Sequence, residues 1–254
     1  MPESEQMTTP LLAVSLKMYL SADRTRSWLR EVTALAPQAD GVDLAVLPTF
    51  PLLESAAAIL SNGPISWGAQ DLAPTEDGAQ TGAVSARVLV ELGCRFVEIA
   101  HAERRRIFAE DETMIADKLR NAAAAGLTPI LCVGETQRVP AAEAATSTAA
   151  ELDHFLAAAD LPVGAELVVA YEPVWAIGAS SAAPQEYVRV VAKALREVTS
   201  GRFATRILYG GSAGPGTLSG LWPAVDGLFL GRFAHDAAAF AAVIREAQQL
   251  SQPA

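Results

Sequence analysis

The sequence is poor in the residues that build metal centres and disulfide frameworks. Its 254 residues include two cysteines and three histidines, and none of them has the paired spacing that zinc sites use. Cys94 and Cys132 both lie in apolar stretches, which favours buried thiols over a disulfide. We therefore expect no metal site and a reducing, cytoplasmic location.

Long hydrophobic runs and nucleotide-binding loops are missing as well. No apolar run approaches the roughly 20 residues that a membrane-spanning helix needs. Residues 1–10 have neither a basic start nor an apolar core, so they predict a loose tail and not a secretory signal. The sequence also lacks a P-loop and a serine nucleophile motif with convincing partners, which argues against hydrolytic chemistry.

Positive charge is scarce, and the formal net charge is -10. A field of this sign repels nucleic acids and anionic membrane surfaces, so neither is expected as a partner. A small anionic ligand would need local cations or backbone N–H groups to bind.

Short apolar segments alternate with longer stretches in which apolar residues recur three and four positions apart. This alternation predicts an α/β fold, a single (β/α)8 barrel over residues 11–254, because such barrels run to about 250 residues. A doubly wound open sheet is the alternative, but no G-x-G-x-x-G turn follows the first segment. The expected strands are Leu11–Ser15, Asp43–Leu47, Ser66–Ala69, Phe96–Ile99, Thr128–Val133, Leu167–Tyr171, Arg206–Tyr209 and Gly227–Leu230. The expected helices include Arg24–Ala36, Ser85–Leu92, Asp111–Ala125, Ala142–Ala159, Pro184–Thr199 and Ala237–Leu250.

The most informative segment follows the sixth expected strand. That strand delivers Glu172, and the next residues are apolar between Pro173 and Gly178. Proline fixes one backbone torsion, and glycine permits torsions that other residues rarely adopt. The segment therefore has a rigid end at Pro173 and a flexible end at Gly178. In a parallel barrel the strand carboxyl ends meet on one face, where a carboxylate base beside a closing lid would reach a ligand.

His101 and Lys17 follow the fourth and first expected strands. A helix beginning after His101 would disfavour the imidazolium form and keep the ring neutral, as a donor to a substrate oxygen must be. The other interpretation is a structural histidine. Lys17 either makes a structural ion pair, with Glu103 as the plausible partner, or holds an anionic substrate, and the two roles are compatible.

Glycines mark the last two strand ends. Gly210 and Gly211 precede Ser212 after the seventh expected strand, and Gly231 precedes Arg232 after the eighth. Glycine lets backbone N–H groups approach an anion closely, and barrels often bind phosphate in these two loops. Glycine also serves ordinary tight turns, so it is the position of these pairs that predicts a phosphate site.

Four motifs resemble those of the triosephosphate isomerase family, and the resemblance covers nearly the whole chain. They are His101–Arg105, Leu131–Thr136, Ala170–Gly178 and Tyr209–Ser212. The resemblance implies an eight-stranded barrel, usually dimeric and free of cofactors, that acts on a small phosphorylated sugar.

The resemblance also implies catalytic roles, in the pairing of a glutamate base with a neutral histidine that is established for this family. Glu172 would move a proton between adjacent carbons, His101 would polarise the carbonyl, and Lys17 would hold the substrate as an enediolate forms. Glu103 would orient the lysine.

Phosphate binding is implied in the same way for Gly178, Ser212, Gly231 and Arg232. Closure of residues 173–180 would exclude water and discourage elimination of phosphate from the intermediate.

Several family positions near the substrate are changed. Ser15 and Leu16 replace asparagine and tryptophan, Tyr19 replaces asparagine, Ala102 replaces serine, and Arg232 replaces glycine. Serine in the first strand with Gly-Arg in the last loop resembles a branch that interconverts L-erythrulose 1-phosphate and D-erythrulose 4-phosphate. The resemblance favours this tetrulose phosphate over the triose phosphates of the main branch. A sugar-phosphate sensor without turnover is a third interpretation.

A homodimer is implied by the resemblance, with the loop Gln80-Thr81-Gly82 reaching the neighbouring subunit. Ala83 stands where the family usually has glutamate, and Ser15 cannot offer an incoming threonine the contacts of asparagine. We predict that the dimer persists despite these changes.

Overall fold

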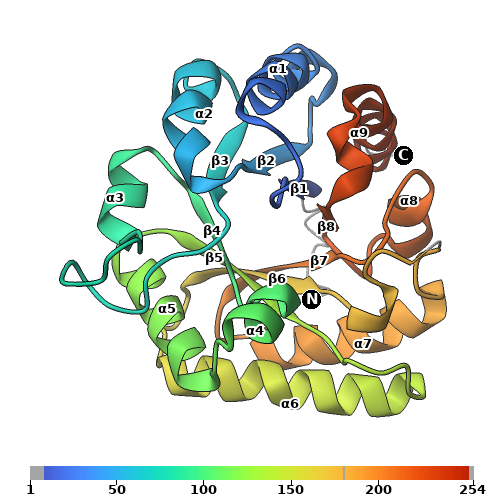
Figure 1. Cartoon of the computed structure of the whole chain (residues 1–254). Coiled ribbons are helices and arrows are strands. Elements are labelled where there is room, and N and C mark those ends of the chain that lie inside the picture. The colour runs from blue at the N-terminus through green and yellow to red at the C-terminus, as the bar shows by residue number, and fades with distance from the viewer. Residues whose placement is uncertain (1–8, 180, 252–254) are drawn as a thin grey trace.

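The predicted strands are all present, and they close into a parallel barrel in sequence order, with β1 pairing β8. The computed structural model describes residues 9–179 and 181–251, so most of the expected tail lies outside the described residues. Figure 1 looks along the barrel, with the helices arranged around it. The strands are β1 (Leu11–Ser15), β2 (Asp43–Leu47), β3 (Ser66–Ala69), β4 (Phe96–Ile99), β5 (Thr128–Val133), β6 (Glu166–Tyr171), β7 (Ala204–Tyr209) and β8 (Gly227–Leu230).

Some of the helices begin where a polar cap precedes an amphipathic segment. In α1, Ser21 accepts a hydrogen bond from the backbone N–H of Arg24, and Trp28, Leu29 and Val32 are buried on one face. The helices are α1 (Ala22–Thr33), α2 (Leu53–Leu60), α3 (Ala86–Glu91), α4 (Ala102–Phe108), α5 (Glu112–Ala124), α6 (Ala141–Ala159), α7 (Gln185–Thr199), α8 (Thr217–Leu221) and α9 (Ala237–Ser251). The helix ranges named from the sequence include neither α2 nor α8. The range expected for α1 also ran on to Ala36, where a short 3-10 turn begins beside a proline.

Two apolar layers hold the barrel together. Inward-facing side chains such as Phe96, Ile130 and Leu208 fill its interior, while a larger layer lies between the strands and the helices. Closure between β8 and β1 requires glycine at position 227, because a Cβ there would lie 1.8 Å from the carbonyl oxygen of Leu11.

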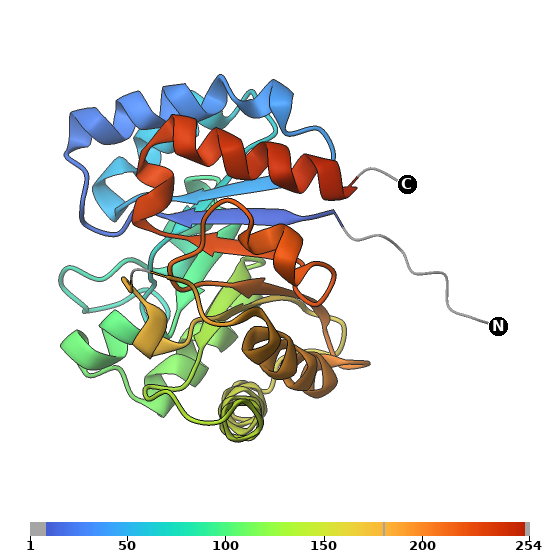
Figure 2. The ribbon, with the colours of Figure 1, turned by 90° about the vertical axis from the view of Figure 1, so that its right-hand side faces the viewer.

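The strands run in one direction, so the loops that follow them gather on one face. In Figure 2 this face lies on the left, with α4 and the loop between β3 and α3. Within residues 9–179 and 181–251, no helix is both long enough and apolar enough to cross a membrane. The carboxyl face of the barrel is where the predicted site residues lie.

Candidate active site

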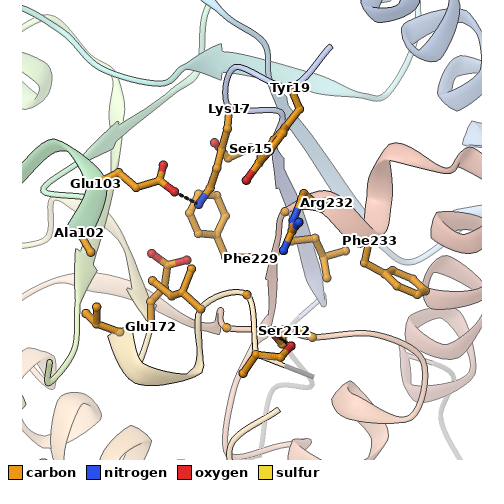
Figure 3. Close-up of a pocket in the computed structure, with 18 of the residues that line it drawn as sticks. Ser15, Lys17, Tyr19, Ala102, Glu103, Glu172, Ser212, Phe229, Arg232 and Phe233 are labelled. Atoms are coloured by element: carbon orange, nitrogen blue, oxygen red, sulfur yellow. Dashed lines mark hydrogen bonds and ion pairs between the residues drawn. The ribbon is translucent and has the colours of Figure 1, made fainter. Parts of the chain in front are cut away.

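A cavity of about 1140 Å³ opens on the carboxyl face of the barrel. Its walls come from the loops after β1, β4, β6, β7 and β8, and Figure 3 shows their side chains pointing into a common space. Ser15, Lys17, Glu103, Glu172, Gly178, Ser212, Gly231 and Arg232 line it. The barrel thus brings together residues from both ends of the chain.

Glu172 lines the cavity, and His101 faces it from behind the cavity wall. Glu172 Oε2 lies 3.4 Å from His101 Nε2, both residues are buried, and neither of these two atoms has a hydrogen-bond partner among the described residues. Glu172 can sit here because position 210 is glycine, since a Cβ there would lie 2.5 Å from Glu172 Cγ. The pair leaves one acceptor and one ring nitrogen free for a ligand.

The protonation of His101 follows from its place at the start of α4. His101 Nδ1 accepts a hydrogen bond of 3.0 Å from the backbone N–H of Glu103. A ring nitrogen that accepts carries no proton, so the neutral ring has its proton on Nε2. His101 can therefore donate a hydrogen bond to an oxygen near Glu172.

Lys17 supplies a positive charge to the same space. Its Nζ makes an ion pair of 2.9 Å with Glu103 Oε1, the pairing that the sequence suggested. Burial opposes the charge, but the hydrogen bond to Glu103 and the fields of Glu172 and Glu98 outweigh it and raise the pKa of Lys17. The backbone of Lys17 has φ +49°, a left-handed conformation that is uncommon outside glycine and often found at functional sites.

The opposite wall of the cavity carries the positive charge of Arg232. Arg106 lines the cavity from α4, on the side of Glu103. Neither arginine has a carboxylate within 4.0 Å among the described residues. Gly178 has φ +72°, and a Cβ at this position would lie 3.5 Å from the Arg232 guanidinium. In Figure 3, Arg232 and Ser212 lie across the cavity from Glu103 and Ala102. This wall suits a phosphate dianion.

The segment after Glu172 is tied to the barrel at several points. Trp175 Nε1 donates a hydrogen bond of 2.7 Å to Glu135 Oε1, which also accepts from Tyr187. Ser212 Oγ donates to the carbonyl oxygens of Ala176 at 3.0 Å and Ala179 at 2.8 Å. The segment expected to form a lid, residues 173–180, is therefore anchored by hydrogen bonds from Trp175 and to Ala176 and Ala179. Ser180 lies outside the described residues.

One buried acidic residue beside the cavity was not predicted from the sequence. Glu98 lies in β4 and points into the barrel above Phe96, where it accepts a hydrogen bond of 2.7 Å from Ser15 Oγ. Its Oε1 lies 4.0 Å from His101 Nε2. The signal was an acidic residue inside an otherwise apolar strand, but strand periodicity alone did not decide which face it occupies.

The arrangement can perform proton transfer beside a carbonyl. An unpartnered carboxylate oxygen can accept a proton from carbon, a ring N–H can polarise an oxygen, and an ammonium group can stabilise the negative charge that develops. Within the part of the chain that the structure describes, no cluster of three or more histidine, cysteine, aspartate or glutamate side chains could hold a metal ion.

Comparison with known proteins agrees with this chemistry. The family model described as triosephosphate isomerase matches residues 10–247. An L-erythrulose-1-phosphate isomerase of Pectobacterium atrosepticum is 47% identical over 96% of this chain and 97% of its own length. Triosephosphate isomerases of Thermus thermophilus and Deinococcus radiodurans are 38% and 41% identical, over 94% and 87% of this chain and 99% and 92% of their own lengths.

Proposed function

The chain belongs to the triosephosphate isomerase family, and from this premise we propose that it isomerises a tetrulose phosphate, L-erythrulose 1-phosphate to D-erythrulose 4-phosphate. Members of this family are isomerases that bind phosphorylated sugars. The observation that carries the proposal is the approach of Glu172 Oε2 to His101 Nε2 at 3.4 Å, where neither atom has a hydrogen-bond partner in the part of the chain that the structure describes. Glu172 lines a cavity that Lys17 and Arg232 also line.

The proposed reaction moves a proton between adjacent carbons. Glu172 removes the proton from C3, and the electron pair forms the C2–C3 double bond of an enediolate. The developing charge on O2 receives a hydrogen bond from His101 Nε2–H and is stabilised by the Lys17 ammonium group. A proton passes from O3 to O2, and Glu172 returns its proton to C2. The net change moves the carbonyl from C2 to C3, so atoms and electrons balance.

Two features support a four-carbon substrate. The relative that is 47% identical is named for erythrulose 1-phosphate, and the family's asparagine and glycine are replaced here by Ser15 and Arg232, both of which line the cavity. The shorter side chain at position 15 leaves room near the reacting atoms. The alternative is isomerisation of dihydroxyacetone phosphate to glyceraldehyde 3-phosphate, which needs the same three groups.

The choice of substrate is tested by offering both ketose phosphates to the purified protein. We expect a higher kcat/KM for L-erythrulose 1-phosphate than for dihydroxyacetone phosphate. A preference for dihydroxyacetone phosphate would reverse the assignment in favour of the glycolytic reaction. Tight binding of phosphoglycolate without exchange of solvent deuterium into either substrate would favour a sensor without turnover.

The base is tested by the substitution Glu172→Gln. The amide cannot accept the carbon proton, so kcat should fall by about 10³-fold for both substrates while phosphoglycolate still binds. Glu143→Gln on the exposed face of α6 removes the same charge away from the cavity and should keep full activity. A Glu172→Gln protein with near-normal turnover would show that another group is the base.

We further propose that the protein acts as a homodimer. The loop Gln80-Thr81-Gly82 is exposed at the carboxyl face, and so is Met18, whose side chain is 95% exposed beside Lys17. The resemblance to the family supports the dimer, and Met18 is the exposed apolar side chain that we expect the partner to cover. The cytoplasmic location, which the sequence suggested, stays a prediction.

A further inference from the structure

Glu98 is a buried carboxylic acid that the proposed proton transfer does not use. Its side chain is within the barrel and its residue is 3% exposed. Ser15 Oγ is its hydrogen-bond donor at 2.7 Å, and among the described residues no lysine or arginine lies within 4.0 Å of it. Lys17, whose charge acts on Glu98, is paired with Glu103.

A structural role gives a poor account of this residue. Burying a carboxyl group without an ion-pair partner costs several kcal/mol, and an apolar side chain would pack with the neighbouring interior residues at no such cost. Burial and the negative charge of Glu172 raise the pKa of Glu98 to about 7, although His101, Ser15 and Lys17 oppose the shift. Shifted acids of this kind, held beside reacting groups, are typical of functional positions.

The position of Glu98 relative to the cationic wall suggests what it binds. Glu98 belongs to β4, which lies across the closed barrel from β8, whose loop carries Arg232. A substrate with its phosphate at Arg232 and its reacting carbons between Glu172 and His101 directs its remaining carbon away from the phosphate. Ser15 lines the cavity, and Glu98 lies directly behind it, 2.7 Å from Ser15 Oγ and 4.0 Å from His101 Nε2. The remaining carbon therefore meets Ser15, which Glu98 supports from behind.

We propose that Glu98 and Ser15 form a binding site for the terminal hydroxymethyl group that distinguishes a four-carbon ketose phosphate from a three-carbon one. This inference rests on the proposed function. Ser15 Oγ donates its proton to Glu98, so its oxygen is left to accept a hydrogen bond from the substrate C4 hydroxyl. Glu98 thus fixes the serine as an acceptor for this hydroxyl. A ketose without the fourth carbon leaves the acid and the serine without this partner, which lowers its transition-state stabilisation.

The test compares two substrates in three variants. Glu98→Gln keeps the shape of the side chain, Ser15→Ala removes the hydroxyl, and the double variant combines them. We expect each single substitution to lower the ratio of kcat/KM for L-erythrulose 1-phosphate to kcat/KM for dihydroxyacetone phosphate by about 10- to 100-fold. The double variant should lose less than the product of the single losses, because both side chains act on one hydroxyl. Glu166→Gln, which removes a glutamate at the amino end of β6, is the matched control and should keep the ratio.

The outcomes separate this inference from the proposed function. Absence of tetrulose phosphate turnover in the unaltered protein would overturn the proposed function. Turnover in the unaltered protein with an unchanged ratio in Glu98→Gln would overturn the hydroxymethyl site alone. An equal loss on both substrates would also overturn it, since Glu98 would then serve the shared enediolate chemistry or the fold. The inhibition constant of phosphoglycolate, which has no terminal hydroxymethyl group, should be retained by every variant and shows that each one folds.

Discussion

At the scale of single residues, the site depends on acids that sit in different surroundings. Glu103 is partly exposed, and although burial raises its pKa, the hydrogen bond and charge of Lys17 lower it by more. Glu98 is enclosed by the barrel, and its pKa rises to about 7. Two glutamates of one molecule thus differ: Glu103 stays an anion, whereas Glu98 can gain or lose a proton near neutral pH.

The buried acid predicts a pH dependence of stability. The pKa of Glu98 is about 7 in the folded protein against an ordinary value of 4.5. Between these values the folded protein binds more protons than the unfolded chain, so this group makes the free energy of unfolding fall as the pH rises from about 4.5 to about 7. Across this pH range, the contribution of Glu98 to the free energy of unfolding falls by an amount on the order of 3 kcal/mol.

Glu98→Gln removes this titration. The variant should gain stability relative to the unaltered protein as the pH rises from 5 to 8, measured by urea unfolding at a fixed protein concentration. Unfolding free energies that change in parallel in the two proteins across this range would show that Glu98 does not titrate as described.

At the scale of elements, the sequence predicted the strands more closely than the helices. Each strand is a short apolar run between turn residues, and β1 and β2 begin and end where the pattern indicated. The helix α8 has only five residues and contains Gly220, so it carries too little periodicity to be recognised. The helix α2 follows an uncapped 3-10 turn and lacks a polar start signal.

The segment after Glu172 is the element that we expect to close over the substrate. Trp175 connects its turn to Glu135 through a hydrogen bond of 2.7 Å to a carboxylate. Trp175→Phe keeps an aromatic ring but loses this bond, so we expect kcat/KM to fall by about tenfold. An enediolate less shielded from water also expels phosphate more often, and the phosphate released per turnover should rise. The measurement is a phosphate assay run beside the isomerase assay.

A tryptophan away from the cavity provides the control for this experiment. Trp67 in β3 donates a hydrogen bond of 3.0 Å to the carbonyl oxygen of Leu92, so Trp67→Phe also removes one indole hydrogen bond. Its turnover and its phosphate release should match those of the unaltered protein. If both variants behave alike, the effect at Trp175 belongs to general destabilisation and not to the lid.

At the scale of the whole molecule, closure of the barrel creates contacts that no local pattern contains. Ser15 and Glu98 are separated by 83 positions and come from strands that are not neighbours, yet their side chains are 2.7 Å apart. Motifs located His101 and Glu172 because their types and positions at strand ends are distinctive. Glu98 depends on the register of β4 within the closed sheet, which sequence periodicity does not supply.

The surface that we expect to form the dimer interface lies beside the cavity. Met18 is 95% exposed and follows Lys17, whose strained backbone a partner subunit would restrain. We expect light scattering at micromolar concentration to give a mass of twice 26.6 kDa. Met18→Glu places a charge in the interface, so it should yield single chains and reduce kcat by at least about tenfold as Lys17 loses support.

Val163→Glu is the matched control for this experiment. Val163 is 85% exposed at the amino end of β6, so the substitution should leave mass and activity unchanged. A single-chain mass for the unaltered protein, or an intact dimer of Met18→Glu, would show that this face is not the interface.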